Sequence, residues 1–202
     1  MRLLLATHNP GKLLELRALL EDLKIELISP DALGLTLGVS EDGKTYAENA
    51  SLKAVAYAQT SGLMTLADDS GLEVDALGGL PGIHSARYSP NPGATDADRR
   101  RLLLRQLSGF PRPWTARFRC FVAIASPTGE LYITEGVCHG EIISEERGQF
   151  GFGYDPIFLF PGLGKTMAEL AMPIKNTLSH RALAVLSARP YLATLLQNQE
   201  QA

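Results

Sequence analysis

Cysteine is scarce in this sequence, in which Cys120 and Cys138 are the only two. Their spacing matches no metal-ligand motif, and two thiols are too few for the disulfide framework of a small secreted domain. The sequence therefore predicts two buried thiols and a reducing compartment. Long apolar runs are also lacking, since Leu3–Ala6 is too short for a signal peptide or a membrane span and no later segment supplies one. We expect a cytoplasmic protein with no membrane partner.

Positive charge is not in excess, because 19 Lys and Arg residues stand against 22 Asp and Glu residues, for a formal net charge of -3. A nucleic-acid surface needs a basic field that displaces counterions from phosphates, so we expect no nucleic-acid partner. A small anionic ligand needs only a few local cations or backbone donors. With 202 residues, 45% of them hydrophobic, the chain can bury a core as one domain or as two small lobes.

Basic residues do cluster on a helix that we expect to begin at Thr95. Arg100 follows Asp96 at the spacing that places opposite charges side by side on a helix. We therefore interpret residues 99–105 as a solvated, ion-paired face and not as a nucleic-acid patch.

The stretch Ala67–Tyr88 holds two adjacent carboxylates and several glycines where a structural segment would hold apolar residues. It follows Leu63–Ala67, an apolar run typical of a buried strand, so Asp68 and Asp69 are expected at the strand's end. We expect Ser70 and Gly71 to turn the chain there. Ligands of open α/β sheets bind beyond the carboxyl ends of strands, which makes the two acids candidates for holding a cation or a water. The alternative is that an Asp side chain caps a turn.

The N-terminal part predicts a strand at 2–6 and a helix at 12–23, because leucines recur there at helical spacing. The turn between them, Thr7–Lys12, presents backbone N–H groups and the positive end of a helix dipole, which suit a phosphate. The alternative is an ordinary capped turn, with Asn9 as N-cap and Pro10 at the first helical position. A second strand is expected at 25–28.

A capping box formed by Thr45 and Glu48 predicts the start of a helix that runs to Gln59. Glu41 lies in the loop before it, where its carboxylate is available to a metal or faces water.

Further along, residues 116–126 and 131–138 predict two strands joined as a hairpin, which indicates an antiparallel part of a mixed sheet. In Gly148–Pro156 glycines alternate with aromatic residues, and such a segment is a platform for stacking a nucleobase. The alternative is that Phe150 or Phe152 fills the core beneath the loop.

The segment Gly162–Thr166 resembles a P-loop but lacks its first glycine, and no adequate helix follows. Ser179–Arg181 precedes an apolar-periodic helix in which Pro190 predicts a break or kink. His180 and Arg181 fall in the first turn, where the helix dipole disfavours cations. We expect a compensating anion there, and a bound ligand would supply it.

These motifs together resemble the inosine triphosphate pyrophosphatase family, whose members remove non-standard purine nucleoside triphosphates. The resemblance rests on separate segments spread over nearly the whole length, namely Thr7–Lys12, Tyr46–Ala50 with Lys53, Ala67–Tyr88, Phe152–Pro156 and Ser179–Arg181. Each segment alone is weak, but in this order they are specific.

The resemblance implies an α/β fold, with a long curved mixed sheet flanked by helices and two lobes around a nucleotide-binding cleft, in a single domain over 1–202. It implies hydrolysis of ITP, dITP, XTP and dXTP between the α and β phosphates, giving a monophosphate and pyrophosphate, with Mg²⁺ as cofactor. It also implies a homodimer.

The family's catalytic proton acceptor matches Asp69, and its metal carboxylates match Glu41 and Asp69. Its substrate-contacting positions match Thr7, His8, Asn9, Pro10, Gly11, Lys12, Lys53, Ser70, Phe152, Gly153, Tyr154, Asp155, Lys175, His180 and Arg181. Two departures stand out: His8 replaces a frequent glycine, and Met172–Ile174 precedes Lys175 where acidic residues are expected.

Two other functions compete with this one. A Maf-like nucleotide pyrophosphatase shares the general architecture but is expected to open with a Ser-rich, Arg-containing phosphate loop, whereas Thr7–Lys12 reads THNPGK. A non-catalytic nucleotide-binding regulator would have no need for Asp69 at a metal. Hydrolysis of ITP to pyrophosphate separates these alternatives.

Overall fold

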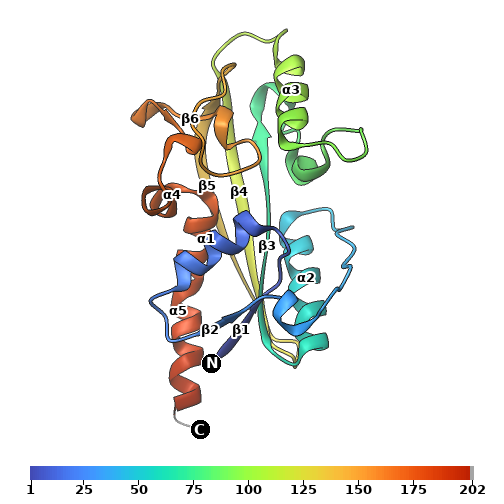
Figure 1. Ribbon diagram of the computed structural model, residues 1–202, viewed down its shortest axis with the longest axis vertical. Helices are drawn as coiled ribbons and strands as arrows, with labels where there is room; N and C mark the ends of the chain where they lie inside the picture. The colour runs from blue at the N-terminus through green and yellow to red at the C-terminus, as the bar shows by residue number, and fades with distance from the viewer. Residues whose placement is uncertain (201–202) are drawn as a thin grey trace. The chain divides into compact units, whose positions relative to one another are not determined.

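The computed structural model describes residues 1–200, with side chains described up to residue 198. Its strands and main helices, in chain order, are β1 (Arg2–Leu5), α1 (Pro10–Leu20), β2 (Glu26–Ile28), α2 (Tyr46–Ser61), β3 (Met64–Val74), α3 (Asp96–Leu107), β4 (Trp114–Ala125), β5 (Leu131–Ile142), β6 (Phe158–Phe160), β7 (Lys165–Thr166), α4 (Met172–Leu178) and α5 (His180–Glu200) (Figure 1).

The strands form one seven-stranded sheet in the order β2-β1-β3-β4-β5-β6-β7. Strand β1 runs parallel to β2 and β3, whereas β6 runs antiparallel to β5 and β7. The sheet is therefore mixed and flanked by helices, and the predicted α/β class is confirmed.

The chain divides into two compact units that share the three long strands β3, β4 and β5. Unit 1 comprises Met1–Asp69, Cys120–Gly136 and His180–Ala202, and unit 2 comprises Ser70–Arg119 and Val137–Ser179. Each unit has its own apolar core and is described by itself below.

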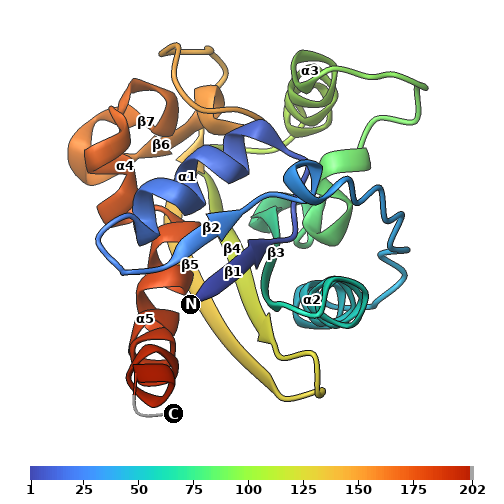
Figure 2. The same cartoon turned by 60° about the horizontal axis from the view of Figure 1, so that its bottom comes forward.

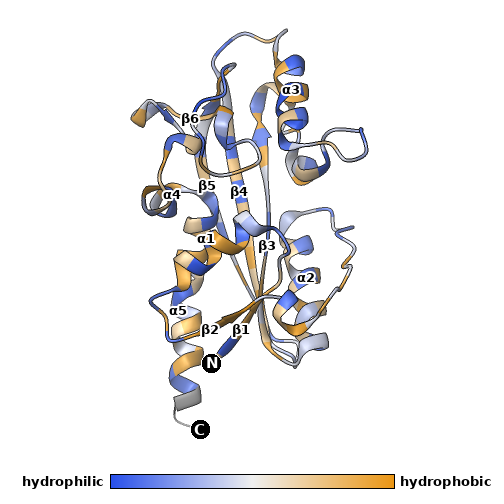
Figure 3. Ribbon diagram, viewed as in Figure 1, coloured by the Kyte–Doolittle hydropathy of each residue, from blue (hydrophilic) through white to orange (hydrophobic). Residues whose placement is uncertain are grey.

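In unit 1, helices cover both faces of the strands. Leu3 and Leu5 of β1 pack with leucines of α1 and with α5, whereas Leu4 and Ala6 pack with α2. This alternation follows from the strand geometry, in which successive side chains point to opposite faces. Figures 1 and 2 both show α1 and α5 on one side of β1 and β2, and α2 on the other. Apolar and polar residues alternate along α5 (Figure 3), as expected for a helix with one buried face.

The core of unit 2 lies around the C-terminal part of β3 and the N-terminal part of β4. Leu72 and Val74 pack with Leu103 and Leu107 of α3, and Phe158 joins them from β6. Helix α3 begins at the predicted N-cap, Thr95, and Asp98 completes a capping box there.

Several predicted boundaries change. Strand β3 does not end at Ala67 but continues through Ser70 and Gly71, so the predicted turn is wrong. Helix α1 begins at Pro10, with Asn9 as N-cap, as the capped-turn alternative predicts. Helix α5 continues past Pro190, so that proline does not end it. Thr45 caps α2 as predicted. The Glu48 carboxylate accepts from the backbone N–H of Lys44 and not from that of Thr45, as a capping box would require.

Candidate active site

The two adjacent acids lie within β3, where the neighbouring strand β1 has already ended. Leu5 pairs with Leu66, and the backbone N–H of Ala6 donates to the carbonyl of Leu66 at 2.8 Å. After Leu66, strand β1 no longer pairs with this edge of β3, and the chain of β1 continues into the turn Thr7–Lys12. The acids therefore do lie past the carboxyl end of a parallel strand, although their own strand continues.

Because β3 is regular here, its two acids face opposite sides of the sheet. Leu66 belongs to the α1 and α5 side, and Ala67 belongs to the α2 side. Asp68 accordingly meets residues of α1 and α5, and Asp69 meets a residue of α2. The neighbouring carboxylates thus belong to different environments.

Asp68 is buried among cations. Its Oδ2 atom accepts from Lys12 Nζ at 3.0 Å and from Arg181 Nε and Nη2 at 3.1 Å each. Burial favours the neutral acid, but Lys12, Arg181 and Lys53 outweigh it and hold the pKa of Asp68 well below its usual value. Asp68 is therefore a fixed anion. Its other oxygen, Oδ1, has no hydrogen-bond partner among the described residues.

Arg181 is only 1% exposed and bridges two acids of unit 1. Besides Asp68 it pairs through Nη1 with Glu15 of α1, which is itself 2% exposed. Burial disfavours the guanidinium, yet Asp68 and Glu15 raise the pKa of Arg181 above its ordinary value. The expected compensating anion is thus present, and Asp68 and Glu15 of the chain itself supply it.

The turn Thr7–Lys12 is pinned by its own side chains. Asn9 Oδ1 accepts from the backbone N–H of Lys12 at 3.1 Å, and Thr7 Oγ1 accepts from the backbone N–H of Asn9 at 3.2 Å. Pro10 and Gly11 open α1, so the positive end of its dipole lies at this turn. The positive end of the dipole and the Lys12 side chain remain suitable for a phosphate group, although the backbone N–H groups of Thr7, Asn9 and Lys12 are already engaged.

His8 does not disturb this turn. Its Nδ1 lies 3.1 Å from Asp31 Oδ1, and its Nε2 lies 3.0 Å from the Tyr57 hydroxyl. The hydroxyl of Tyr57 also donates to the carbonyl of Leu37 at 3.1 Å. The histidine side chain therefore ties the turn after β1 to α2 and to the segment that leads to Glu41.

Asp69 is held by an asparagine. Asn49 Nδ2 donates to Asp69 Oδ2 at 3.1 Å, and Asn49 Oδ1 accepts from the backbone N–H of Gly43 at 2.8 Å. A Cβ on Gly43 would lie 2.6 Å from that Oδ1, so the close approach requires glycine. Burial raises the pKa of Asp69 above its ordinary value, whereas Lys12 and Lys53 oppose the rise.

Glu41 and Lys53 form an ion pair beside the two aspartates. Lys53 Nζ lies 2.5 Å from Glu41 Oε1 and donates to the main-chain carbonyl of Asp68 at 3.0 Å. The Glu41 carboxylate also adds to the rise in the pKa of Asp69. The structure thus brings together Glu41, Lys53 and both aspartates, and Glu41 is not simply solvated.

These oxygens fit a hard divalent cation. Carboxylate oxygens are the ligands that Mg²⁺ prefers, and it commonly takes one or two of them together with substrate phosphates and waters. Glu41 and Asp69 could supply two. Asp68 faces the other side of β3. Within the part of the chain that the structure describes, no three His, Cys, Asp or Glu side chains converge as a metal site. A cation here would therefore need further ligands from substrate or water.

A second group of predicted residues lies in unit 2. Lys175 Nζ contacts Asp155 Oδ2 at 2.6 Å, and both residues are buried. The same Oδ2 accepts from the backbone N–H of Phe152 at 3.0 Å. Lys175 also lies 5.2 Å from the centre of the Phe152 ring. The flat ring, an acid and a lysine thus form one fixed cluster.

The aromatic residues of this segment differ in their roles. Phe150 is 50% exposed and Phe152 is partly exposed, so neither fills the core as the alternative proposed. Tyr154 takes that place, and its hydroxyl donates to the carbonyl of Ser85 at 3.0 Å. Two residues of α3 hold Gly153: its carbonyl accepts from Arg100 Nη1, and its backbone N–H donates to Asp96 Oδ2. Arg100 pairs with Glu146 and Arg99 pairs with Asp96, so the basic helix face is ion-paired as predicted, but not through the expected pair of Asp96 and Arg100.

The other predicted positions are less informative. Ser70 belongs to unit 2 and is partly exposed within β3, and His180 opens α5 as a buried residue. Gly162–Thr166 forms a short turn and the strand β7, which confirms that it is no P-loop.

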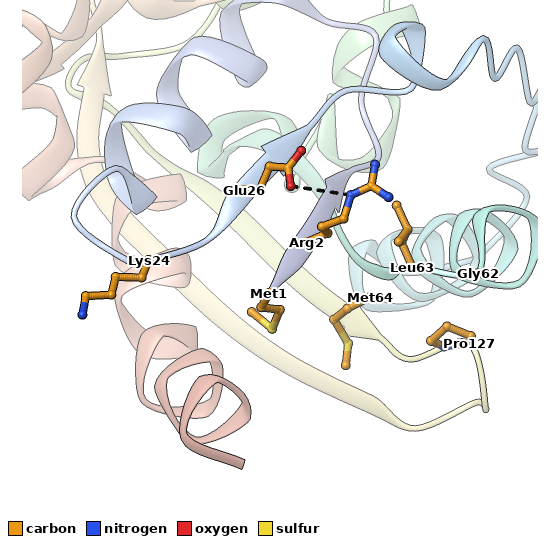
Figure 4. A pocket seen from close by; sticks show the side chains of 8 residues that line it. All are labelled: Met1, Arg2, Lys24, Glu26, Gly62, Leu63, Met64 and Pro127. Carbon is orange, nitrogen blue, oxygen red and sulfur yellow. Dashed lines mark ion pairs between the residues drawn. The ribbon is translucent and has the colours of Figure 1, made fainter. Parts of the chain in front are cut away.

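A hollow of about 630 Å³ lies in unit 1 near the starts of β1, β2 and β3. Figure 4 shows its lining, in which Arg2 pairs with Glu26 and Lys24 points away from the other side chains. The Arg2–Glu26 pair is 3.7 Å apart and exposed. This hollow lacks the converging acids and lysines of the site at Asp68 and Asp69, so we do not assign it a ligand.

Sequence reasoning missed two supporting residues, Glu15 and Asn49. Glu15 follows Lys12 by one helical turn and interrupts a run of leucines on α1. Asn49 precedes Lys53 by one turn on α2. A polar residue on the apolar face of a helix was the available signal in both cases.

Unit 1 therefore contains a paired set of acids and lysines beside the start of a helix, an arrangement that could hold a phosphate group and a divalent cation. The chain belongs to the Ham1 family, whose model matches residues 3–191. The predicted family resemblance is thereby confirmed.

Individual relatives agree over nearly the whole chain. A dITP/XTP pyrophosphatase of Desulforamulus reducens is 46% identical over 201 residues, which cover 99% of this chain and 100% of that protein. A dITP/XTP pyrophosphatase of Bacillus subtilis is 44% identical over 183 residues, covering 90% of this chain and 92% of that protein. The structure of a HAM1 protein from Coxiella burnetii matches with a TM-score of 0.84 at 39% identity, covering 98% of this chain and 99% of that one.

Proposed function

We propose that this protein hydrolyses non-standard purine nucleoside triphosphates, namely ITP, dITP, XTP and dXTP, to the nucleoside monophosphate and pyrophosphate. The relatives named dITP/XTP pyrophosphatases support this activity. One observation in the structure carries the proposal most directly: Lys12 and Lys53 flank the adjacent Asp68 and Asp69 in unit 1. Cleaving the α-β phosphoanhydride demands charge neutralisation and a proton acceptor, and these residues can provide both.

We assign the phosphates to the turn Thr7–Lys12 and to Lys53. The positive dipole end at the start of α1 favours anionic oxygens. Lys12 adds a positive charge that Asp68 holds in place at 3.0 Å. His8 supports the turn through Asp31 and Tyr57.

Asp69 is proposed to accept the proton of the attacking water. Burial raises its pKa, which makes it a stronger base than an exposed carboxylate, and Asn49 fixes its orientation. We propose Mg²⁺ as the cofactor, held by Glu41 and Asp69 together with the substrate. When bound, it would supply positive charge to the phosphoryl oxygens during cleavage.

We propose that the other matched positions also contact the nucleotide. In unit 2 the Phe152 ring would stack on the purine, next to Ser70, Gly153, Tyr154 and Asp155, and Lys175 would add positive charge for the phosphate chain. In unit 1, His180 and Arg181 are proposed to contact the substrate, and Arg181 also holds Asp68.

A homodimer remains a proposal that rests on the family resemblance. Light scattering at micromolar concentration is expected to give twice the 21.8 kDa of one chain, and a mass of one chain would overturn it.

Among the described residues, none of the helices combines the length and the apolar character that a membrane span needs. The cytoplasmic location stays a prediction from the sequence.

The direct test of the activity is incubation with ITP and Mg²⁺, followed by separate detection of pyrophosphate and inorganic phosphate. We expect pyrophosphate and IMP in equal amounts. Release of inorganic phosphate without pyrophosphate would show that a bond other than the α-β phosphoanhydride is cleaved. Binding of ITP without turnover would support a non-catalytic regulator.

A further inference from the structure

The ammonium group of Lys53 contacts Glu41, one of the two proposed metal ligands. Lys53 sits inside α2, with its side chain 13% exposed, and contacts Glu41 Oε1 at 2.5 Å and the carbonyl of Asp68 at 3.0 Å. Both partners belong to unit 1, so the chain itself holds Lys53 beside Glu41.

The ammonium group of Lys53 lies among acids. Glu41 Oε1 contacts it directly, and its other contact is the main-chain carbonyl of Asp68, the residue before Asp69 in β3. Glu41 and Asp69 are the proposed metal ligands. A lysine ammonium and a divalent cation would therefore compete for the Glu41 carboxylate.

We propose that Lys53 is a built-in counter-cation of the metal site, which pairs with Glu41 in the resting protein and is displaced when the divalent cation binds. This inference rests on the proposed metal site of Glu41 and Asp69. An ammonium group and a divalent ion repel each other strongly when both lie against one carboxylate. Metal binding at Glu41 is therefore expected to displace Lys53 from it.

Displacement gives the lysine a second position. Its flexible four-carbon stem lets the ammonium group leave Glu41 for another anion. The phosphate chain of the substrate is such an anion, and Lys53 would reach it only after the exchange. The metal and the nucleotide consequently favour each other's binding, because each relieves the charge that the other leaves uncompensated.

The inference makes a distinctive prediction for the protein without nucleotide. Removing the charge of Lys53 should tighten the binding of the metal alone, although it should abolish turnover. A residue whose only task is to hold substrate phosphate would not affect metal binding in this way. Loss of structure would weaken binding, which is the opposite sign.

The experiment is titration of the full chain with Mn²⁺ alone, followed by electron paramagnetic resonance, and with Mg²⁺ alone by calorimetry. We expect Lys53→Met to bind Mn²⁺ at least about fivefold tighter than wild type, within the usual range of coupling between linked sites. Lys53→Arg keeps the charge and should stay near wild type. Lys44→Met is the matched control, since Lys44 is an exposed lysine of the neighbouring loop.

Further variants separate the possible failures. Lys53→Gln provides a second neutral side chain if Lys53→Met does not fold, and circular dichroism checks both. Lys53→Met combined with Glu41→Gln should lose the gain. If Glu41→Gln weakens Mn²⁺ binding but neither neutral variant strengthens it, the counter-cation role is overturned and the metal site stands. If Glu41→Gln binds Mn²⁺ like wild type, the metal site itself is wrong. Hydrolysis of ITP is scored separately.

Discussion

The side-chain amide of Asn49 donates to Asp69 Oδ2 at 3.1 Å and accepts from the backbone of Gly43 at 2.8 Å. One buried asparagine on α2 therefore fixes both the proposed base and the loop that carries Glu41. Neither contact is visible in the sequence pattern.

Replacing this asparagine should impair the reaction without unfolding the protein. Residues that orient metal-ligating groups typically contribute about 10- to 100-fold in metal affinity or activity, so we expect a loss of that size for Asn49→Ala. The measurement is kcat/KM for ITP at several Mg²⁺ concentrations. Asn91→Ala, in an exposed turn of unit 2, is the control. Equal rates for the two variants would remove Asn49 from the site.

Asp69→Asn should keep the fold and lose nearly all turnover. A positioned base contributes about 10²- to 10⁴-fold, and the metal would lose a ligand as well. Asp68 cannot substitute, because it faces the other side of β3 and is held by Arg181. Steady-state hydrolysis of ITP checks this, with Asp75→Asn as an exposed control. A rate near that of wild type would eliminate Asp69 as base and ligand.

Arg181→Ala should destabilise the protein strongly, because it leaves Asp68 and Glu15 as buried acids with reduced compensation. Breaking a buried ion pair typically costs about 3–5 kcal/mol. Arg189→Ala removes an arginine that pairs with the exposed Asp22, for which about 0–1 kcal/mol is usual. Urea unfolding of the two variants compares them on one helix. Similar losses for both would contradict the structural role of Arg181.

Asp155→Asn should release the segment around Phe152. The carboxylate of Asp155 binds Lys175 and the backbone N–H of Phe152 through the same oxygen. The neutral amide keeps the size but weakens both contacts. We expect KM for ITP to rise more than kcat falls, if this segment holds the base. Asp98→Asn, on α3 of the same unit, controls for loss of an acid, and a change confined to kcat would contradict the assignment.

ITP and XTP should be hydrolysed far faster than ATP. Hypoxanthine and xanthine carry a 6-oxo acceptor, whereas adenine presents a 6-amino donor, and Arg181 has only donors. Sites built around such a bond discriminate by as much as roughly 10⁴-fold. The ratio of kcat/KM for ITP and ATP is the measurement, because loss of folded protein lowers both rates alike. We expect Arg181→Ala to reduce this ratio, and an unchanged ratio would limit Arg181 to holding Asp68.

Local signals predicted the capped turn at Asn9 and Pro10, the N-cap at Thr95 and the hairpin strands. Each of these depends on neighbours within a few residues. The continuation of β3 through Ser70 and Gly71 was not predictable, because polar residues and glycine favour a turn locally and only the surrounding sheet overrides them. The partners of Arg181 were equally hidden, since Asp68 lies 113 residues away and Glu15 lies 166 residues away.

Each unit contains one of the two buried cysteines, Cys120 in unit 1 and Cys138 in unit 2. Burial raises the pKa of the Cys120 thiol, so the reactive thiolate is suppressed in the folded state. Thiol-specific reagents would then modify either cysteine only when its own unit opens. Single-cysteine variants, treated with such a reagent and followed by mass spectrometry, would therefore time the opening of each unit separately without adding a new cysteine.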